Sequence, residues 1–332
     1  MAPRTLTRVN ATKPARRSSS GVIANIVLLV IAALWLVGSF QALRVLVAGS
    51  LRTQPESVAN LIMSLSGTIA GAVFGGAAAG YLARSAKVRP FTAMSRHVCA
   101  LSGGVVVGLV TAGLSFYTFG ATPAVATIVA GVAGCAAVIG SLFAAAKNRD
   151  IVFAGLVGTL LVFVVMFLRG WFGGLVNSLY HSNPDAYRWI AIAAGLVIGL
   201  CVGLCGYLVL RRLQPKTSLY GFLAAGAAPG ALWMFSEIAT RIAAALLVAN
   251  TAEPDVLSGL MMDQSLQAQL DGSMAALFAG ATTTVLAFGL LAPKADAKAK
   301  AAKRGTAVPA QKSKAKKTAP DAKRGGGKKS TA

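Results

Sequence analysis

Long apolar runs separated by short polar segments fill the chain from residue 22 to residue 291. The hydrocarbon core of a bilayer is about 30 Å thick, and about 20 apolar residues in a helix cross it. The pattern therefore predicts an all-α integral membrane protein with eight transmembrane helices. The runs that predict them are Val22–Val47, Val58–Ala83, Val98–Phe119, Ala124–Ala146, Ile151–Val176, Trp189–Leu210, Leu219–Ala249 and Met274–Leu291.

The composition agrees with helices embedded in lipid. Charged residues make up 13% of the 332 residues and hydrophobic residues 55%, whereas a soluble domain carries about 25% charged residues. The first apolar run follows Arg16 and Arg17, as in a secretory signal, but signal peptides have apolar cores of only about 7–15 residues. Because this run is longer than that, we expect an uncleaved first transmembrane helix.

The basic residues of the loops are predicted to lie on one side of the membrane. Eight helices place both termini and three of the seven loops together, and this side carries five basic residues before Gly21 and nine in its loops. The opposite loops carry two basic residues, Arg52 and Arg188, and six acidic ones. Because basic loops stay in the cytoplasm, both termini are expected there. The Ala-, Gly- and Val-rich, Arg-biased composition favours a bacterial plasma (inner) membrane.

The two halves of the membrane region resemble each other in sequence. "ALR" ends at Arg44 and "FLR" at Arg169, while "GYLAR" begins at Gly80 and "GYLVLRR" at Gly206, which gives offsets of 125 and 126 residues. Further matches join Pro90 to Pro215, Gly131 to Gly280 and Gly140 to Gly289. Four helices per half would give both halves the same orientation in the membrane. The matches predict two tandem parallel four-helix repeats, and chance similarity between Gly- and Ala-rich helices is the alternative.

This reading divides the chain into four parts. They are a basic cytoplasmic N-terminal segment (1–21), a first four-helix half (22–146), a second four-helix half (147–292) with an acidic outer loop (250–272), and a Lys/Ala-rich cytoplasmic tail (293–332). Within the outer loop, "DQSLQAQLDG" is predicted to form a short amphipathic helix. The tail holds 13 of the 32 basic residues, two acidic residues and no aromatic one, so we expect it to be disordered.

The basic tail predicts contact with negatively charged partners. A lysine or arginine near an anionic bilayer surface contributes about 1 kcal/mol, so besides the lipid bilayer itself we expect anionic lipid headgroups as partners of the tail. A protein partner or a homo-oligomer is the alternative. Nucleic acid is not expected, because the tail has no aromatic residue on which bases could stack.

Small residues at four-residue spacing mark predicted helix-packing faces. Lipid tails are as apolar as leucine, so membrane helices associate through close backbone approach and interhelical hydrogen bonds. A row of glycines permits that approach, either for static packing, which we favour, or as a sliding surface. The glycines in these rows are Gly67, Gly71, Gly75, Gly104, Gly108, Gly195, Gly199 and Gly203.

The seventh run carries two charges inside an apolar stretch. Glu237 and Arg241 are four residues apart, so they share a helix face and are predicted to neutralise each other. Pro229 and Gly230 lie about two turns earlier, and proline is predicted to break the helix there. Charges inside the membrane are costly and indicate function, so these four residues form the candidate polar site. In the alternative, Arg241 extends to the outer surface and the pair is a structural clamp.

The sequence offers no motif for catalysis, a metal or a cofactor. It lacks a phosphate-binding loop, an H-E-x-x-H helix and a nucleophile elbow, so we expect neither an enzyme nor a resident cofactor. The leading hypothesis is transporter-like movement of a small solute, ion or lipid through a polar site on a broken seventh helix. The alternative is a structural or regulatory membrane subunit whose tail recruits anionic lipid or a cytoplasmic partner.

Overall fold

The structure of this protein is a computed structural model that describes residues 20–50, 56–85, 96–171, 184–214, 217–250 and 256–291. Regular secondary structure within these ranges is entirely helical, and none of the described residues forms a strand. The predicted basic tail (293–332) lies outside the described residues, and so does the predicted N-terminal segment up to residue 19.

The described helices follow the predicted apolar runs closely. Seven of them are long and apolar enough to cross a membrane, so this part of the chain has the architecture of a multi-pass membrane protein. The remaining helix, α5, has 23 residues, and the count of eight spans stays a prediction. The helices are α1 (Ser20–Ser50), α2 (Glu56–Ser85), α3 (Arg96–Phe119), α4 (Pro123–Ala144), α5 (Arg149–Trp171), α7 (Pro184–Leu213), α8 (Leu219–Asn250) and α9 (Val256–Leu291).

Large apolar side chains cover the outward faces of these helices. Leu34 on α1 and Leu109 on α3 are 68% and 69% exposed, and comparable side chains project from α7 and α9. A soluble monomer rarely exposes apolar surface on such a scale. The outward faces are therefore suited to contact with lipid.

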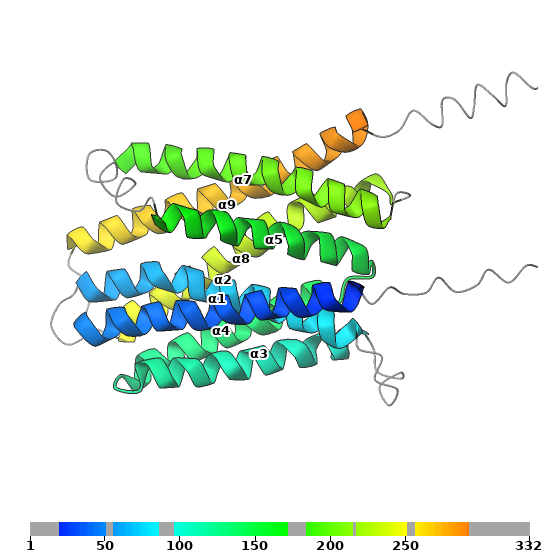
Figure 1. Cartoon of the computed structure of the whole chain (residues 1–332). Helices are drawn as coiled ribbons and strands as arrows, with labels where there is room; N and C mark the ends of the chain where they lie inside the picture. The colour runs from blue at the N-terminus through cyan, green and yellow to red at the C-terminus, as the bar shows by residue number, and fades with distance from the viewer. Residues whose placement is uncertain are drawn as a thin grey trace, which may run out of the picture. The chain divides into compact units, whose positions relative to one another are not determined.

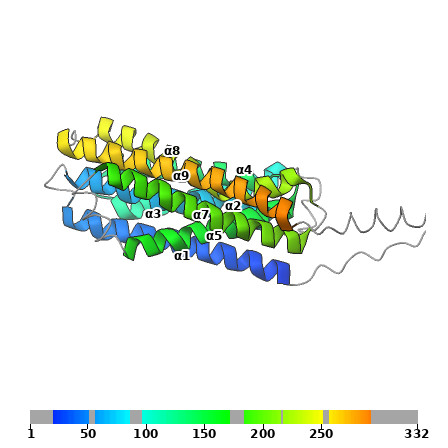
Figure 2. The same cartoon turned by 90° about the horizontal axis from the view of Figure 1, so that it is seen from above.

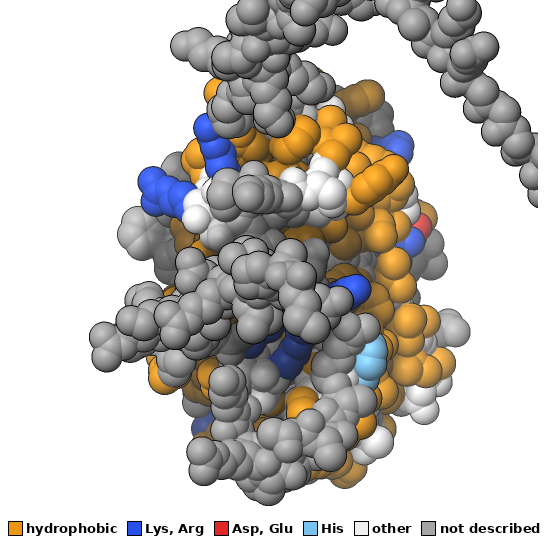
Figure 3. Space-filling model, turned by 90° about the vertical axis from the view of Figure 1, so that its right-hand side faces the viewer, with side chains coloured by type: hydrophobic (Ala, Val, Ile, Leu, Met, Phe, Trp, Pro, Cys, Tyr) orange, Lys and Arg blue, Asp and Glu red, His pale blue; other side chains and the backbone are white. Residues whose placement is uncertain are grey.

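Basic side chains gather at one end of the helix bundle. α1 begins and α9 ends at the same end, on the right of Figure 1 and again in the view from above (Figure 2). Viewed from that end, blue side chains of lysine and arginine stand among the apolar ones (Figure 3). The helix directions assign five of the described basic residues to it: Arg84, Lys147, Arg149, Arg211 and Arg212.

Two groups of helices meet along α2 and α8. In the first group α2 contacts α1, α3 and α4, and in the second group α8 contacts α5 and α7. The groups join where α8 lies against α2 and α4. A polar side chain on the facing sides of α2 and α8 therefore lies at the junction of the two groups.

Helices approach most closely where small residues face each other. A Cβ atom added at Gly76 in α2 would overlap the carbonyl oxygen of Ala137 in α4, and one added at Gly140 would overlap that of Val73. α7 meets α9 in the same manner along three successive turns, through the pairs Gly195–Gly272, Gly199–Ala276 and Gly203–Gly280. These contacts hold the helices at backbone-to-backbone distance, as expected in lipid.

The glycines predicted to mark packing faces have different surroundings. Seven of the eight face atoms of a neighbouring helix: Gly71, Gly75, Gly104, Gly108, Gly195, Gly199 and Gly203. At Gly67, an added Cβ would have no atom within 4 Å. Its backbone has another role, because the carbonyl oxygen of Gly67 accepts a hydrogen bond of 3.1 Å from Trp35 Nε1 on α1.

Two of the glycine matches between the halves differ in their surroundings. Gly140 packs against α2, whereas Gly289 has no atom within 4 Å of an added Cβ. Gly131 likewise borders open space, whereas Gly280 packs against α8. These two matches therefore do not pair positions with equivalent contacts.

A short turn connects α4 to α5 and is held by two arginines. Arg149, at the start of α5, donates a hydrogen bond to Ser85 Oγ and places its guanidinium 5.6 Å from the ring centre of Tyr81. Arg84, in the last turn of α2, donates to carbonyl oxygens that the end of α4 leaves without helical partners. These belong to Ala144 (2.9 Å), Ala146 (2.5 Å) and Lys147 (3.2 Å).

The predicted break in the seventh run is absent. α8 continues from Leu219 to Asn250 with Pro229 inside it, because one lost backbone hydrogen bond does not end a membrane helix whose neighbours pack around it. The predicted outer loop 250–272 also differs. α9 begins at Val256 and extends through most of that range, with Ser265 and Leu266 buried on its inner face.

A substitution at Gly76 tests the close contact between α2 and α4. Gly76→Ala should destabilise the protein by about 1–3 kcal/mol, the usual effect of overpacking, because the added methyl would overlap the backbone of α4. Thermal unfolding in a mild detergent measures the change. The control is Gly131→Ala, which adds a methyl to open space and should leave stability unchanged or slightly raised. Equal melting temperatures for both variants would contradict the contact.

Candidate functional site at the contact between α2 and α8

Glu237 lies on α8 and reaches across to α2. Its carboxylate oxygen Oε1 accepts a hydrogen bond of 2.7 Å from Ser66 Oγ and one of 2.9 Å from Trp233 Nε1. Ser66 belongs to α2, whereas Trp233 lies one turn before Glu237 on α8, the direction in which helical side chains lean. Only 1% of Glu237 is exposed. The carboxylate therefore bridges the two helix groups from a fully buried position.

The carboxylate is embedded in an apolar cluster. Leu65 of α2 and Leu232 and Ala239 of α8 belong to this cluster, which also draws residues from α1, α3, α4 and α9. Removing a charged carboxylate from water costs several kcal/mol even after the protein relaxes around it. Hydrogen bonds from Ser66 and Trp233 offset part of that cost, and a proton or a cation bound at the carboxylate would cancel the charge itself.

Arg241 does not form an ion pair with Glu237, so the predicted neutralisation is wrong. Its Nη2 donates instead to Gln267 Oε1 on α9 at 2.7 Å, and Gln267 Nε2 donates to Asp271 Oδ1 at 3.0 Å. Asp271 in turn forms a salt bridge of 2.6 Å with Arg188 on α7. The helical spacing determines the face of α8 on which Arg241 lies, but not the residue that it contacts. The resulting chain of polar contacts links α7, α8 and α9.

Pro229 and Gly230 form a close crossing of three helices. A Cβ added at Gly158 of α5 would lie 2.7 Å from Cγ of Pro229, and one added at Gly230 would overlap the backbone of Leu277 in α9. Both residues are buried. They therefore allow α5 and α9 to pack against α8, and they do not create an opening for a solute beside α8.

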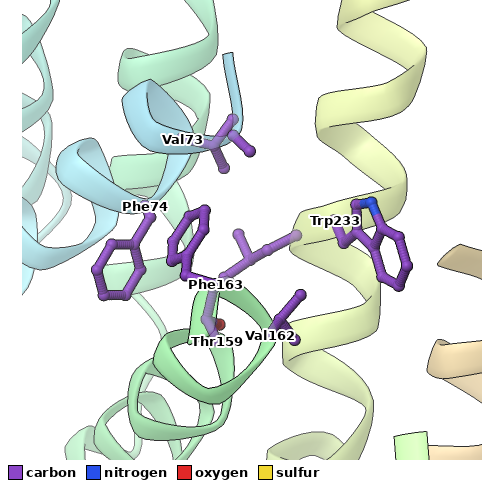
Figure 4. A pocket seen from close by; sticks show the side chains of 8 residues that line it. Val73, Phe74, Thr159, Val162, Phe163 and Trp233 are labelled. Atoms are coloured by element: carbon purple, nitrogen blue, oxygen red, sulfur yellow. The ribbon is translucent and has the colours of Figure 1, made fainter. Parts of the chain in front are cut away.

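A very small cavity lies next to Trp233, between α2, α5 and α8. Figure 4 shows its lining, in which Phe74 and Phe163 lie side by side while Trp233 projects from α8. The rings of Phe74 and Phe163 meet edge to face with their centres 5.1 Å apart. The cavity measures about 10 Å³, which is space for about one water molecule. In this conformation a solute larger than water does not fit beside Trp233.

Two hydroxyl groups accompany Glu237 on the buried face of α8. Ser236 Oγ donates to the carbonyl oxygen of Trp233 at 2.7 Å, and Thr240 Oγ1 donates to that of Ser236 at 2.8 Å. Both side chains are 0% exposed. Because their protons are engaged within the helix, they give the buried face polar character while leaving Glu237 as its charged group.

The arrangement suits binding of a proton or a small cation more than bond-breaking chemistry. The groups that donate to Glu237 Oε1 are the hydroxyl of Ser66 and the indole N–H of Trp233, and both are neutral. In the described part of the chain, no three His, Cys, Asp or Glu side chains are grouped as metal ligands. A carboxylate that accepts from neutral donors can gain and lose a proton without rearranging a ligand shell.

Several residues of the site were not predicted from the sequence. The contact of Trp233 could have been predicted, since Trp233 lies four residues before Glu237 and so on the same helix face. The contact of Ser66 could not have been predicted, because nothing in the sequence indicates which face of α2 meets α8. Gln267 and Asp271 are themselves four residues apart, within the stretch predicted to be a short amphipathic helix of the outer loop, but that helix was not expected to join the bundle.

Replacement of Glu237 tests whether its hydrogen bonds stabilise the bundle. Glu237→Leu leaves the Ser66 hydroxyl and the Trp233 indole N–H without their acceptor, so it should be about 1–3 kcal/mol less stable than the equally uncharged Glu237→Gln. Glu237→Gln keeps an acceptor oxygen of the same reach, so its stability should stay within about 1 kcal/mol of the wild type. Thermal unfolding in detergent measures both variants. A leucine variant as stable as the glutamine variant would show that these hydrogen bonds contribute nothing.

Comparisons with known proteins give no relative from which a role could be transferred. No protein-family model, no curated protein and no solved structure matches the chain. The assignment of function therefore rests on the geometry of the described helices and above all on the buried carboxylate between α2 and α8.

Proposed function

We propose that the protein is a transporter-like membrane protein in which Glu237 binds a proton or a cargo ion at the contact between α2 and α8. The observation that carries this proposal is a carboxylate only 1% exposed within a bundle of membrane-length helices. Ionisable groups inside a membrane are costly, and they typically belong to ion paths and proton relays. The cargo is a small solute, an ion or a lipid.

The hydrogen bonds of Glu237 suggest how binding would be coupled to movement. Bonds to a charged acceptor are about twice as strong as bonds between neutral groups. A proton on the carboxylate would therefore weaken its bonds to Ser66 and Trp233, and with them the contact between the two helix groups. Protonation would in this way favour a conformation in which α8 has moved against α2.

We further propose that the moving parts are two duplicated halves. In the first group α2 contacts α1 and α3, and in the second α7 correspondingly contacts α5 and α8. A Cβ added at Gly80 would lie 2.9 Å from the carbonyl oxygen of Ala100, and one added at Gly206 would lie 3.3 Å from that of Ala225. These contacts recur at nearly equal spacing, since 206 − 80 = 126 and 225 − 100 = 125, which supports the duplication.

In this proposal eight helices span a bacterial plasma membrane with both termini in the cytoplasm. The basic end of the bundle would face the cytoplasm, and the tail would lie on anionic headgroups there. The common end at which α1 begins and α9 ends supports this orientation (Figure 1).

A structural or regulatory membrane subunit is the second candidate. The unbroken α8 and the one-water size of the cavity beside Trp233 favour it. Glu237 and Ser66 would then form a fixed clamp between the helix groups. The basic tail would recruit anionic lipid or a cytoplasmic protein.

Thiol labelling distinguishes a moving site from a fixed clamp. Ser236→Cys and Thr240→Cys are each introduced after replacement of Cys99, Cys135, Cys201 and Cys205, and vesicles are treated with a membrane-impermeant thiol reagent. Both positions are 0% exposed here, so labelling requires a second conformation that admits water. We expect labelling of at least one position, at a rate that Glu237→Gln changes.

Two further cysteines control this experiment. Gln214→Cys lies at the exposed end of α7 and should react, whereas Leu34→Cys lies on a lipid-facing side of α1 and should not. If the controls behave so and neither test position reacts from either side of the membrane, the transport proposal is refuted.

Deletion of residues 294–332 tests the second candidate. A subunit that acts through its tail should lose its biological role after the deletion, while the helices retain their melting temperature. Growth or another cellular phenotype of the deletion strain, compared with Glu237→Gln, measures the effect. An unchanged phenotype for the deletion together with a defect for Glu237→Gln would argue against the subunit and for the buried site.

A further inference from the structure

A larger cavity of about 280 Å³ lies between α4, α5 and α8, with α2 at its base. Its walls are apolar throughout. The cavity exists because the helices present alanine and glycine residues here, which are too small to fill the space between the helices. The floor and edges are formed by Ala224, Ala228 and Ala231 of α8, Gly155 and Ile151 of α5, and Phe143 of α4.

The edges of this crevice reach the outside of the bundle. Phe143 is 37% exposed, and Ala146 and Ala224 are exposed as well. Apolar walls offer water no hydrogen-bonding partner, so ordered water would bind poorly. From Ala224 to Ala231 the crevice follows α8 for about 10 Å at 1.5 Å per residue. A space of this shape fits a hydrocarbon chain that lies along the helices.

Basic residues stand at the mouth of the crevice. Ala146 and Ile151 line it, and between them in the chain lie Lys147 and Arg149, with Asp150 as the acidic residue of that segment. The side chain of Lys147 is exposed. Arg149 is held in place by Ser85 and by the ring of Tyr81, as described above. The mouth is therefore positively charged directly beside an apolar slot.

We propose that this crevice binds one acyl chain of an anionic phospholipid whose headgroup contacts Lys147 and Arg149. The apolar slot accounts for the chain, and the charge at its mouth selects the headgroup. The site consists of residues of the helix bundle, on α2, α4, α5, α8 and the α4–α5 turn, and the proposal does not involve the basic tail. It does not depend on the role of Glu237 and would exist in a transporter or in a regulatory subunit.

Lipid retention in detergent tests this site. The full-length protein is delipidated in a nonionic detergent, and dioleoylphosphatidylglycerol or dioleoylphosphatidylcholine is added back and counted on the protein by native mass spectrometry. We expect one phosphatidylglycerol to bind more tightly than phosphatidylcholine. Lys147→Gln should weaken that binding about fivefold, the contribution of one basic residue near an anionic headgroup. Ala227→Phe should abolish it by filling the slot.

Matched variants separate the crevice from general lipid binding. Arg212→Gln removes an exposed charge at the same end, and Ala193→Phe adds a ring to an exposed face of α7; both should bind phosphatidylglycerol as the wild type does. The basic tail is present in every variant, so it does not contribute to the differences. Glycerol phosphate without acyl chains should not compete, because the slot would then stay empty.

Any one of four results would overturn the proposal. Equal affinity of the wild type for the two lipids would remove the headgroup selectivity. A loss of binding with Ala227→Phe but not with Lys147→Gln would mean an apolar slot without charge recognition. A loss with Lys147→Gln but not with Ala227→Phe, or competition by glycerol phosphate, would mean a surface phosphate contact without the crevice.

Discussion

Helices surrounded by lipid gain little by burying large apolar side chains, so their association depends on how closely their backbones can approach. The protein meets this constraint by placing small residues where its helices approach most closely, while large apolar side chains also cover the outward faces. Ala72, Ala77 and Ala137 are almost completely buried, while Leu34 and Leu109 face outward. The close contacts of α2 with α4 and of α7 with α9 follow from the small residues that face each other there.

Close packing of this kind leaves few places where a polar group can be accommodated. Within the described helices, Glu237 occupies one such place, where Ser66 and Trp233 replace the water that its carboxylate has lost. The polar chain from Arg241 to Arg188 occupies another, between α7, α8 and α9. At both places hydrogen bonds join neighbouring helices. Such bonds fix which residues face each other, whereas contacts between small residues alone do not.

The helices could be predicted from the sequence because their formation in lipid is a local matter. Each backbone group must find its partner within its own segment, so length and apolar composition alone gave bounds within a few residues for most runs. The start of α9 was not predicted, because Asp263 and Asp271 interrupt the apolar run and the expected transmembrane helix was therefore shorter than α9. Partner choice was not predictable in the same way: Arg241 and Gln267 belong to different helices, and their meeting depends on how α9 is rotated and placed. Pro229 was misjudged for a related reason, since its neighbours in α5 and α9 decide whether the helix continues.

The turn between α4 and α5 has a mechanical consequence. Residues 145–148 connect the last helix of the first group to the first helix of the second, and the hydrogen bonds of Arg84 fasten this connection to the end of α2. A connection this short cannot lengthen. Any rotation of one helix group against the other must therefore pivot about residues 145–148. The displacement would then be smallest at the basic end of the bundle and would grow toward the opposite face of the membrane.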